Sequence, residues 1–242
     1  MKMLITVAAV SVLSACGGGG GGGTPDATNT AQGIWDGTVT GGFNASVAIL
    51  ENGETWGIYA SGNSLVGAVY GQTTSTNTSL TGNVLSFDFV QRLSGTGTYT
   101  GNVTPKSTIS FVANDGDRFT GSYDAAYDQP ASSANLAGSY TGFAVTGTTL
   151  NQSLPITISA NGVINGTVTS GNLSCAASGT ATPRASGKNI FDIRLNFAGG
   201  FCDPAVGPTA TGIAFYDVTS RQVGVMVLNP AKTDGLVYIG TR

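Results

Sequence analysis

Residues 190–197 read Ile-Phe-Asp-Ile-Arg-Leu-Asn-Phe, and from Phe191 onward apolar and polar side chains alternate. Alternation with a period of two places successive side chains on opposite faces of a β-strand. Residues 154–160 and 85–89 follow the same pattern. No stretch after residue 16 has a convincing period of 3.6, which would indicate an amphipathic helix. The sequence therefore predicts an all-β protein.

The composition agrees with a β fold and excludes several kinds of active site. The 242 residues include 37 glycines, about twice the usual share of roughly 7%, and only 10% of residues are charged. Glycine is costly inside helices, so a helical bundle is disfavoured. The chain has no histidine, which rules out Ser-His-Asp and Cys-His catalysis and any histidine-ligated zinc or iron site. We expect a protein that is not an enzyme and uses no cofactor.

An internal repeat divides the chain into halves. The sequence Gly-Ile-Trp-Asp-Gly at 33–37 recurs as Gly-Ser-Tyr-Thr-Gly at 138–142. In each copy a later strand runs into an Asn-Gly pair, at 52–53 and at 161–162. Asn-Gly between strands is the strongest short signal for a β-hairpin. The two halves therefore follow one plan.

We interpret each half as one domain, at 33–129 and 136–242, joined by a polar linker at 130–135. Each half contains about eight short strands with short connections, as in an antiparallel meander. The predicted architecture is two tandem up-and-down β-barrels, because closure removes exposed strand edges; a β-sandwich is the alternative. Glycines inside strands, such as Gly101 and Gly121, mark sharp bends or close backbone approaches. Side chains can just fill an eight-stranded barrel, so we expect no sizeable cavity.

The N-terminus has the organisation of a secretion signal. A basic start precedes an apolar run, 3–12, which is too short to span a bilayer as a helix. The sequence Leu-Ser-Ala-Cys at 13–16 follows, and it resembles the lipobox of bacterial lipoproteins. The resemblance implies that residues 1–15 are removed as a signal peptide and that Cys16 carries a lipid anchor. Two or more acyl chains hold a protein stably at a membrane.

Seven glycines at 17–23 follow the predicted lipidated cysteine, and residues 16–32 together are typical of a flexible tether. Its r.m.s. reach is roughly 20–24 Å, which would hold the folded part close to the membrane. In bacterial lipoproteins an aspartate directly after the cysteine is the usual signal for inner-membrane retention, and Gly17 stands there instead. The resemblance therefore implies an outer-membrane lipoprotein, on either the periplasmic or the cell-surface face.

The opening of the chain, up to Thr-Pro-Asp at 24–26, resembles surface lipoproteins of the transferrin-binding protein B, factor H-binding protein and heparin-binding antigen kind. This likeness covers residues 1–26 and implies export, not a ligand. Basic residues are sparse and scattered, which disfavours nucleic acid or heparin as a partner. We expect a binding or structural module for a protein or glycan. Carriage of a small ligand and a role in envelope assembly are the alternatives.

Two cysteines remain once Cys16 is assigned to lipid, namely Cys175 and Cys202. Export places them in an oxidising compartment, so we predict a structural disulfide between them. In the chain-entropy model a loop of about 28 residues closed in this way stabilises the fold by roughly 3–4 kcal/mol.

Gly33-x-Trp35 resembles the start motif of lipocalins, in which the tryptophan closes the barrel base and packs on a late arginine. Arg118 and Arg242 are the candidates for that arginine, and Tyr140 replaces the tryptophan in the second copy. The resemblance implies carriage of a small ligand. Our first interpretation of Trp35 and Tyr140 is structural, as aromatic plugs of the two barrels.

Two acidic clusters lie in predicted turns. The sequence Asn-Asp-Gly-Asp at 114–117 lacks the alternating ligands and terminal glutamate of an EF-hand calcium loop. We interpret it as a hairpin turn and keep Asp115 and Asp117 only as calcium candidates; no other metal site is predicted. Glu51 and Glu54, the only glutamates, flank one Asn-Gly pair, so we expect exposed turn residues and not a catalytic pair.

Overall fold

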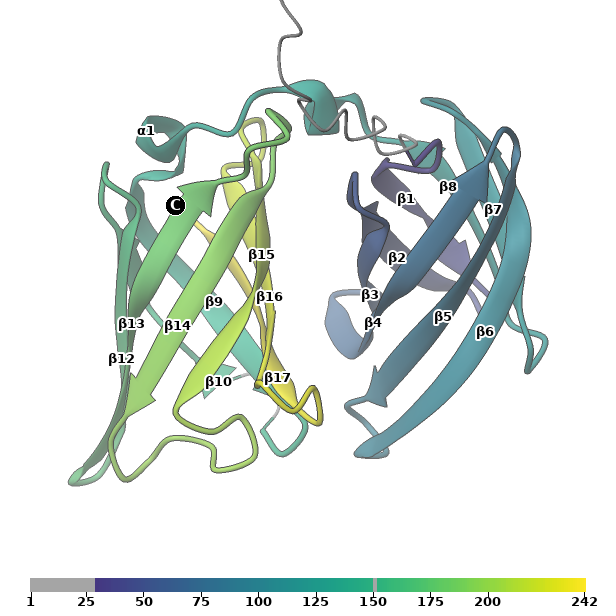
Figure 1. Cartoon of the computed structure of the whole chain (residues 1–242). Coiled ribbons are helices and arrows are strands. Elements are labelled where there is room, and N and C mark those ends of the chain that lie inside the picture. The colour runs from purple at the N-terminus through teal and green to yellow at the C-terminus, as the bar shows by residue number, and fades with distance from the viewer. Residues whose placement is uncertain (1–28, 150–151) are drawn as a thin grey trace, which may run out of the picture.

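The computed structural model describes residues 29–149 and 152–242, which form two antiparallel β-barrels standing side by side (Figure 1). The strands of barrel 1 are β1 (Gly33–Val39), β2 (Phe43–Ile49), β3 (Glu54–Ser61), β4 (Ser64–Thr76), β5 (Ser79–Asp88), β6 (Leu93–Thr104), β7 (Thr108–Ala113) and β8 (Arg118–Tyr123). Each strand pairs with the next in the chain, and β1 also pairs with β8, where Trp35 faces Tyr123. The predicted up-and-down barrel is confirmed.

Barrel 2 repeats this plan. Its strands are β9 (Gly138–Thr146), β10 (Gln152–Ser153), β11 (Ile156–Ile158), β12 (Val163–Ser170), β13 (Leu173–Pro183), β14 (Phe191–Ala198), β15 (Thr209–Asp217), β16 (Gln222–Leu228) and β17 (Gly235–Thr241). The short strands β10 and β11 both pair with β9, so they share one position in the barrel, and β17 pairs with β9 to close it. The sequence pattern predicts one unbroken strand there. Pro155, which has no N–H to donate to a ladder, stands at the break.

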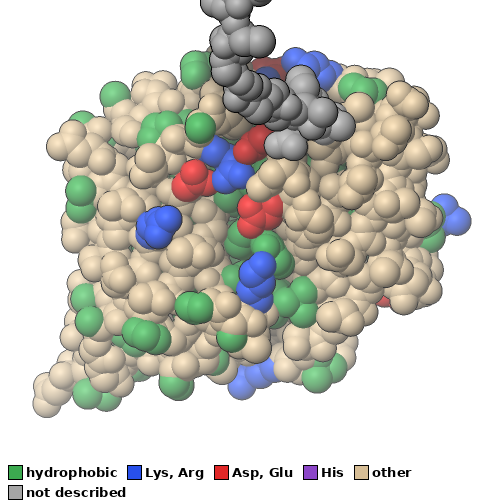
Figure 2. All heavy atoms as spheres, in the orientation of Figure 1, with side chains coloured by type: hydrophobic (Ala, Val, Ile, Leu, Met, Phe, Trp, Pro, Cys, Tyr) green, Lys and Arg blue, Asp and Glu red, His purple; other side chains and the backbone are tan. Residues whose placement is uncertain are grey.

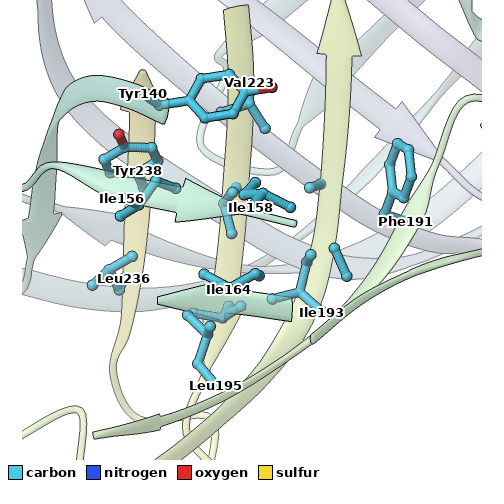
Figure 3. Packing of buried hydrophobic residues seen from close by; sticks show 14 of the residues in the cluster. Tyr140, Ile156, Ile158, Ile164, Phe191, Ile193, Leu195, Val223, Leu236 and Tyr238 are labelled. Carbon is cyan, nitrogen blue, oxygen red and sulfur yellow. The ribbon is translucent and has the colours of Figure 1, made fainter. Parts of the chain in front are cut away.

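The inward-facing side chains of the alternating strands form a core in each barrel. In barrel 2 the predicted set on β14, which includes Phe191, Ile193 and Leu195, is buried in one core together with Ile164 and Tyr238 of other strands (Figure 3). The core of barrel 1 includes Trp35, Ile49, Leu80, Val103, Ile109 and Phe119. Period-two alternation therefore identified the buried face of these strands correctly.

Glycine inside a strand permits a close backbone approach at Gly101 on β6. A Cβ added there would lie 2.0 Å from the backbone oxygen of Ser110 and 2.6 Å from Cα of Phe111, both on the neighbouring strand β7. Real Cβ atoms do not come that near to backbone atoms, so only glycine fits this position.

A short helical segment joins the barrels. The sequence pattern extends the last strand of barrel 1 to residue 127, but β8 ends at Tyr123 and the 3-10 helix η1 (Ala125–Asp128) follows. The helix α1 (Ser133–Leu136) overlaps the predicted linker, and Leu136 is buried in the core of barrel 2. Among the residues that the structure describes, no helix has the length and apolar character needed to cross a membrane.

A third apolar cluster, here called the seam, packs the two barrels together. It is built from outward-facing side chains of both, among them Ala48, Trp56 and Phe87 from barrel 1 and Val145, Ile213 and Val237 from barrel 2. Strands at the seam therefore bury apolar side chains on both faces where the two barrels meet. On β2, for example, Ala48 faces the seam while its neighbours Val47 and Ile49 face the core of barrel 1.

Charged side chains gather over the junction of the barrels (Figure 2). Arg184, between β13 and β14, donates to Glu51 of barrel 1 at 2.8 Å and to Asp192 of barrel 2 at 2.5 Å. Lys232 of barrel 2 donates to the hydroxyl of Tyr70 in barrel 1 at 2.6 Å. Polar contacts thus supplement the apolar packing of the seam.

Candidate ligand site in barrel 1

Because the strands of barrel 1 alternate in direction, the turns after β1, β3, β5 and β7 lie at one end, here called the mouth (lower end in Figure 1). A cavity of about 630 Å³ extends from the mouth into the barrel. Its wall is mostly apolar and includes Phe43, Val47, Ile58, Val84, Phe111 and Phe119. Cavities of this size, with apolar walls and a few polar groups, are the usual sites of small ligands.

The wall of the cavity changes from exposed at the mouth to buried at its inner end. Gln91 and Asp117 at the mouth are exposed, whereas Thr55 and Tyr99 farther in are only 4% and 5% exposed. The expectation that side chains leave no sizeable cavity is wrong, most clearly for barrel 1 and to a smaller extent for barrel 2, which has a cavity of about 310 Å³.

Two tyrosine side chains, long enough to fill the interior of barrel 1, lie along the wall of the cavity. Tyr99 is the cross-strand partner of Gly82, and Tyr59 is the partner of Gly67. A Cβ added at Gly82 would lie 2.3 Å from Cζ of Tyr99, and one at Gly67 would lie 2.1 Å from Cζ of Tyr59. Each phenol thus occupies the space above a glycine of the neighbouring strand. The middle of the barrel stays open as a result.

Three hydroxyl groups form a chain at the inner end. The Tyr99 hydroxyl lies 2.5 Å from Oγ1 of Thr73, which lies 2.5 Å from Oγ1 of Thr55. Thr55 in turn donates to the carbonyl oxygen of Gly53 at 3.0 Å. A carbonyl can only accept, and each hydroxyl has one hydrogen. With the Thr55 hydrogen used on Gly53, Thr73 donates to Thr55 and Tyr99 donates to Thr73. The Gly53 carbonyl also accepts the N–H of Thr73 at 2.7 Å.

Tyr99 is therefore the first donor of the hydroxyl chain. Its phenolic oxygen can still accept a hydrogen bond, because neither threonine donates to it. Burial raises the pKa of Tyr99, so its hydroxyl keeps the hydrogen that it donates to Thr73.

Charged side chains line the cavity only near the mouth. They are Asp88, Asp115, Asp117 and Arg118. Asp88 accepts the N–H of Gln91 at 2.8 Å, and Asp115 accepts the N–H of Asp117 at 3.1 Å, so both order their own turns. Asp115 and Asp117 lie in the predicted hairpin turn, between β7 and β8. Within the described ranges, no three metal-ligating side chains come together in a way that could hold an ion.

Trp35 and Tyr140 occupy equivalent places in the two barrels. Trp35 is fully buried and donates from Nε1 to the carbonyl of Ala31 at 2.9 Å. Tyr140 is equally buried and donates its hydroxyl to the carbonyl of Leu136 at 2.6 Å. Each aromatic thus holds the carbonyl four residues before it, which supports their interpretation as plugs. Ala31 belongs to the predicted tether, yet the structure packs it into the core of barrel 1.

The arginine expected beside Trp35 is not there. Arg118 lies at the mouth, away from Trp35, and Arg242 packs over the ring of Tyr216 in barrel 2, with its Cζ 5.2 Å from the ring centre. The partner of the Trp35 ring is Tyr123, edge-on at 5.3 Å between ring centres. The likeness to the lipocalin start motif does not extend to its Trp–Arg contact.

The corresponding end of barrel 2 is covered by a longer connection. Residues 199–208 join β14 to β15, whereas residues 89–92 make the equivalent connection in barrel 1. Val206 of this longer loop is buried in the core of barrel 2. A smaller cavity of about 310 Å³ remains beneath the loop.

Two further contacts fix this covering loop. The predicted disulfide between Cys175 and Cys202 is confirmed, and it ties the loop to β13. The carboxylate of Asp203 accepts hydrogen bonds from the hydroxyls of Thr146 and Thr148, at the end of β9. The loop thus covers and partly fills barrel 2 at the end where barrel 1 is open, and the cavity left there has about 310 Å³ against about 630 Å³ in barrel 1.

The other predicted site residues lie away from the cavity. Glu51, in the turn after β2, pairs with Arg184 at the junction of the barrels, and Glu54 begins β3. Cys16 lies outside the described residues, so its lipidation stays a prediction.

Sequence reasoning missed the cavity and the hydroxyl chain. Thr55 and Thr73 are 18 residues apart, and Thr73 and Tyr99 are 26 apart, so only the strand register brings them together. A tyrosine on one strand and a glycine on a neighbouring strand were the available sequence signal for an open barrel interior. The signal is informative only when the strand register shows that the two residues are cross-strand partners. Comparison with protein-family models, curated proteins and solved structures gave no match.

Proposed function

We propose that this chain is a lipid-anchored, non-enzymatic binding protein that takes a small, mainly apolar ligand into barrel 1. The observation that carries the proposal is the cavity of about 630 Å³, with its apolar wall and its opening at the mouth. Barrel 2, whose cavity is about half as large beneath its covering loop, is then a structural companion that the seam holds in place.

The distribution of reactive groups supports binding over catalysis. The wall contains no thiol and the chain contains no histidine. The carboxylates of the wall stand at the mouth, and Asp88 and Asp115 are occupied with their own turns. Deeper in, the polar groups are hydroxyls such as those of Tyr59 and Ser86. Such a wall can hold and orient a molecule, but it offers no activated nucleophile or general base.

The contacts of the first described residues show at which end of barrel 1 the N-terminal segment enters. Asn29 donates to the carbonyl of Thr73, and Ala31 accepts from Trp35, so the chain enters barrel 1 at the end opposite the mouth. If Cys16 is anchored, the tether joins barrel 1 at the end opposite the mouth, so the anchor does not attach beside the opening of the cavity. A protein or glycan partner on the outer surface, expected from the sequence, stays a prediction. We favour the cavity because it offers a defined volume, whereas the seam already uses many outward apolar side chains.

A fluorescent probe tests the cavity. We expect N-phenyl-1-naphthylamine, an uncharged apolar dye, to bind a form that begins at Thr24 with one-to-one saturation. Val84→Trp places a large ring in the cavity and should weaken the dye at least tenfold. Asn83→Trp adds the same ring on the exposed face of the same strand and should leave binding unchanged. Equal binding by the two variants, or no saturable binding by the parent, would refute the proposal.

The anchor needs a separate test in cells. Cys16→Ala should release the protein from membranes into the soluble fraction, because the acylated residue is lost. A variant that still sediments with membranes would show that the lipobox interpretation is wrong. Protease treatment of intact cells then distinguishes the cell-surface face from the periplasmic face.

A further inference from the structure

We infer that the ligand of barrel 1 is an uncharged apolar alcohol, which presents its hydroxyl hydrogen to the phenolic oxygen of Tyr99. This inference rests on the proposed function and narrows it to a chemical class. It follows from the polarity of the hydroxyl chain at the inner end of the cavity and from the charges at its mouth.

The hydroxyl chain sets the first condition. All three of its hydrogens are used inward, toward Gly53, so the chain has no hydrogen left to offer a ligand. Tyr99 lines the cavity and is only 5% exposed, so its acceptor is largely shielded from bulk water. A ligand atom that meets it gains a hydrogen bond only if it is a donor. An ether or carbonyl oxygen would face a second acceptor, with both left unsatisfied.

The charges at the mouth set the second condition. Asp88, Asp115 and Asp117 line the cavity there against a single cation, Arg118. An anionic ligand would be repelled by this excess of negative charge, either as it enters the cavity or when its charged group stays at the mouth. Deeper in, the wall carries no cation to pair with an anion, and an unpaired buried charge is strongly disfavoured. A carboxylate is therefore a poor fit at either end.

The apolar wall sets the third condition. Between the mouth and Tyr99 the cavity is bordered by side chains such as Val47, Val84 and Phe119, which favour a hydrocarbon body. An alcohol whose hydroxyl lies at Tyr99 and whose hydrocarbon part fills this space meets all three conditions.

Three probe molecules with similar hydrocarbon chains test separately the need for a hydrogen-bond donor and the exclusion of a negative charge. We would measure displacement of the bound dye by 1-decanol, by its isomer 1-methoxynonane, which cannot donate, and by decanoate. The protein is the form that begins at Thr24, which keeps every described residue. The alcohol should bind at least about fivefold more tightly than the ether, the difference expected from one buried acceptor left unsatisfied. Decanoate should bind most weakly of the three.

Tyr99→Phe removes the acceptor and retains the ring. In this variant the preference for the alcohol over the ether should disappear, while ether binding stays unchanged. Tyr238→Phe removes a buried hydroxyl in barrel 2, which has no hydrogen-bond partner in the structure, and should keep the preference. The comparison of the three probes on the parent protein does not depend on either variant being stable.

The outcomes distinguish this inference from the proposal on which it rests. If the ether or decanoate binds as tightly as the alcohol, the alcohol assignment is overturned while the cavity remains a binding site. If the dye itself does not bind, the binding function fails, and the inference fails with it. A preference for the alcohol that Tyr99→Phe abolishes and Tyr238→Phe retains supports the inference.

Discussion

The side chain of Arg184 in barrel 2 donates from Nε to Oε1 of Glu51 in barrel 1 at 2.8 Å, across a sequence separation of 133 residues. The Arg184 side chain is 16% exposed and that of Glu51 is 36% exposed, so the pair is largely sheltered at the junction. Arg184 also holds Asp192 of its own barrel. One guanidinium therefore connects a turn of the first barrel to a strand of the second.

Loss of this guanidinium should destabilise the joined barrels. We expect Arg184→Gln to lower the free energy of unfolding by about 1–2 kcal/mol, because two carboxylates lose a charged donor but remain partly solvated. Urea denaturation followed by tryptophan fluorescence measures the change. Arg194→Gln, at an exposed position on β14, is the control and should have little effect. Similar losses in both variants would contradict the importance of the junction.

Asp128 should make the free energy of unfolding depend on pH in the acid range. The side chain of Asp128 accepts hydrogen bonds from Lys106 of barrel 1 and Lys188 of barrel 2, and these lower its pKa to about 2. The unfolded value is about 3.9, so the folded protein holds the proton less tightly. This contribution is present above the unfolded value and is lost as the pH falls through about 2.

Asp128→Asn therefore should be less stable than the parent at pH 7, and the difference should vanish near pH 2. Urea unfolding at a series of pH values gives the measurement. A deficit that stays constant down to pH 2 would show that the contacts of Asp128 with the two lysines are not electrostatic in origin.

The glycine beneath Tyr99 should not tolerate a side chain. A Cβ at Gly82 would meet Cζ and the hydroxyl of Tyr99 at 2.3 and 2.4 Å and the backbone oxygen of Gln72 at 2.7 Å. Gly82→Ala should therefore cost about 1–3 kcal/mol, as overpacking does. Gly95→Ala on β6, where nothing lies within 4 Å of the added carbon, is the matched control and should be nearly neutral. Thermal or urea unfolding decides between them.

The disulfide should support the closed end of barrel 2. The double change Cys175→Ser with Cys202→Ser should lower the free energy of unfolding by roughly 3–4 kcal/mol. It should also make the covering loop, residues 199–208, more sensitive to proteolysis, because the loop loses its link to β13. Reduction of the parent with dithiothreitol should reproduce both effects. A loop that resists protease as before would mean that Val206 and Asp203 suffice to hold it.

Local sequence patterns predicted most of the fold. The alternation at Phe191–Phe197 identified a strand with one buried face, and the Asn-Gly pairs marked hairpin turns. The disulfide could be predicted from the cysteine count once Cys16 was set aside. The seam was missed, although runs such as Val-Met-Val-Leu at 225–228 are apolar at every position and so indicate a strand buried on both faces.

The sequence by itself determined the β class, the two similar antiparallel halves and the cysteine pair, because each depends on neighbours along the chain or on simple counting. The pairing of β1 with β8 and of β9 with β17 decided for barrels over a sandwich. Only the tertiary structure decided that barrel 1 is open inside and barrel 2 is covered. In barrel 1 the difference depends on the strand register, which places Tyr99 over Gly82. In barrel 2 it depends on the covering loop, which inserts Val206 into the core of that barrel. Residues that meet through strand register lie tens of positions apart, so no local pattern can specify the space between them.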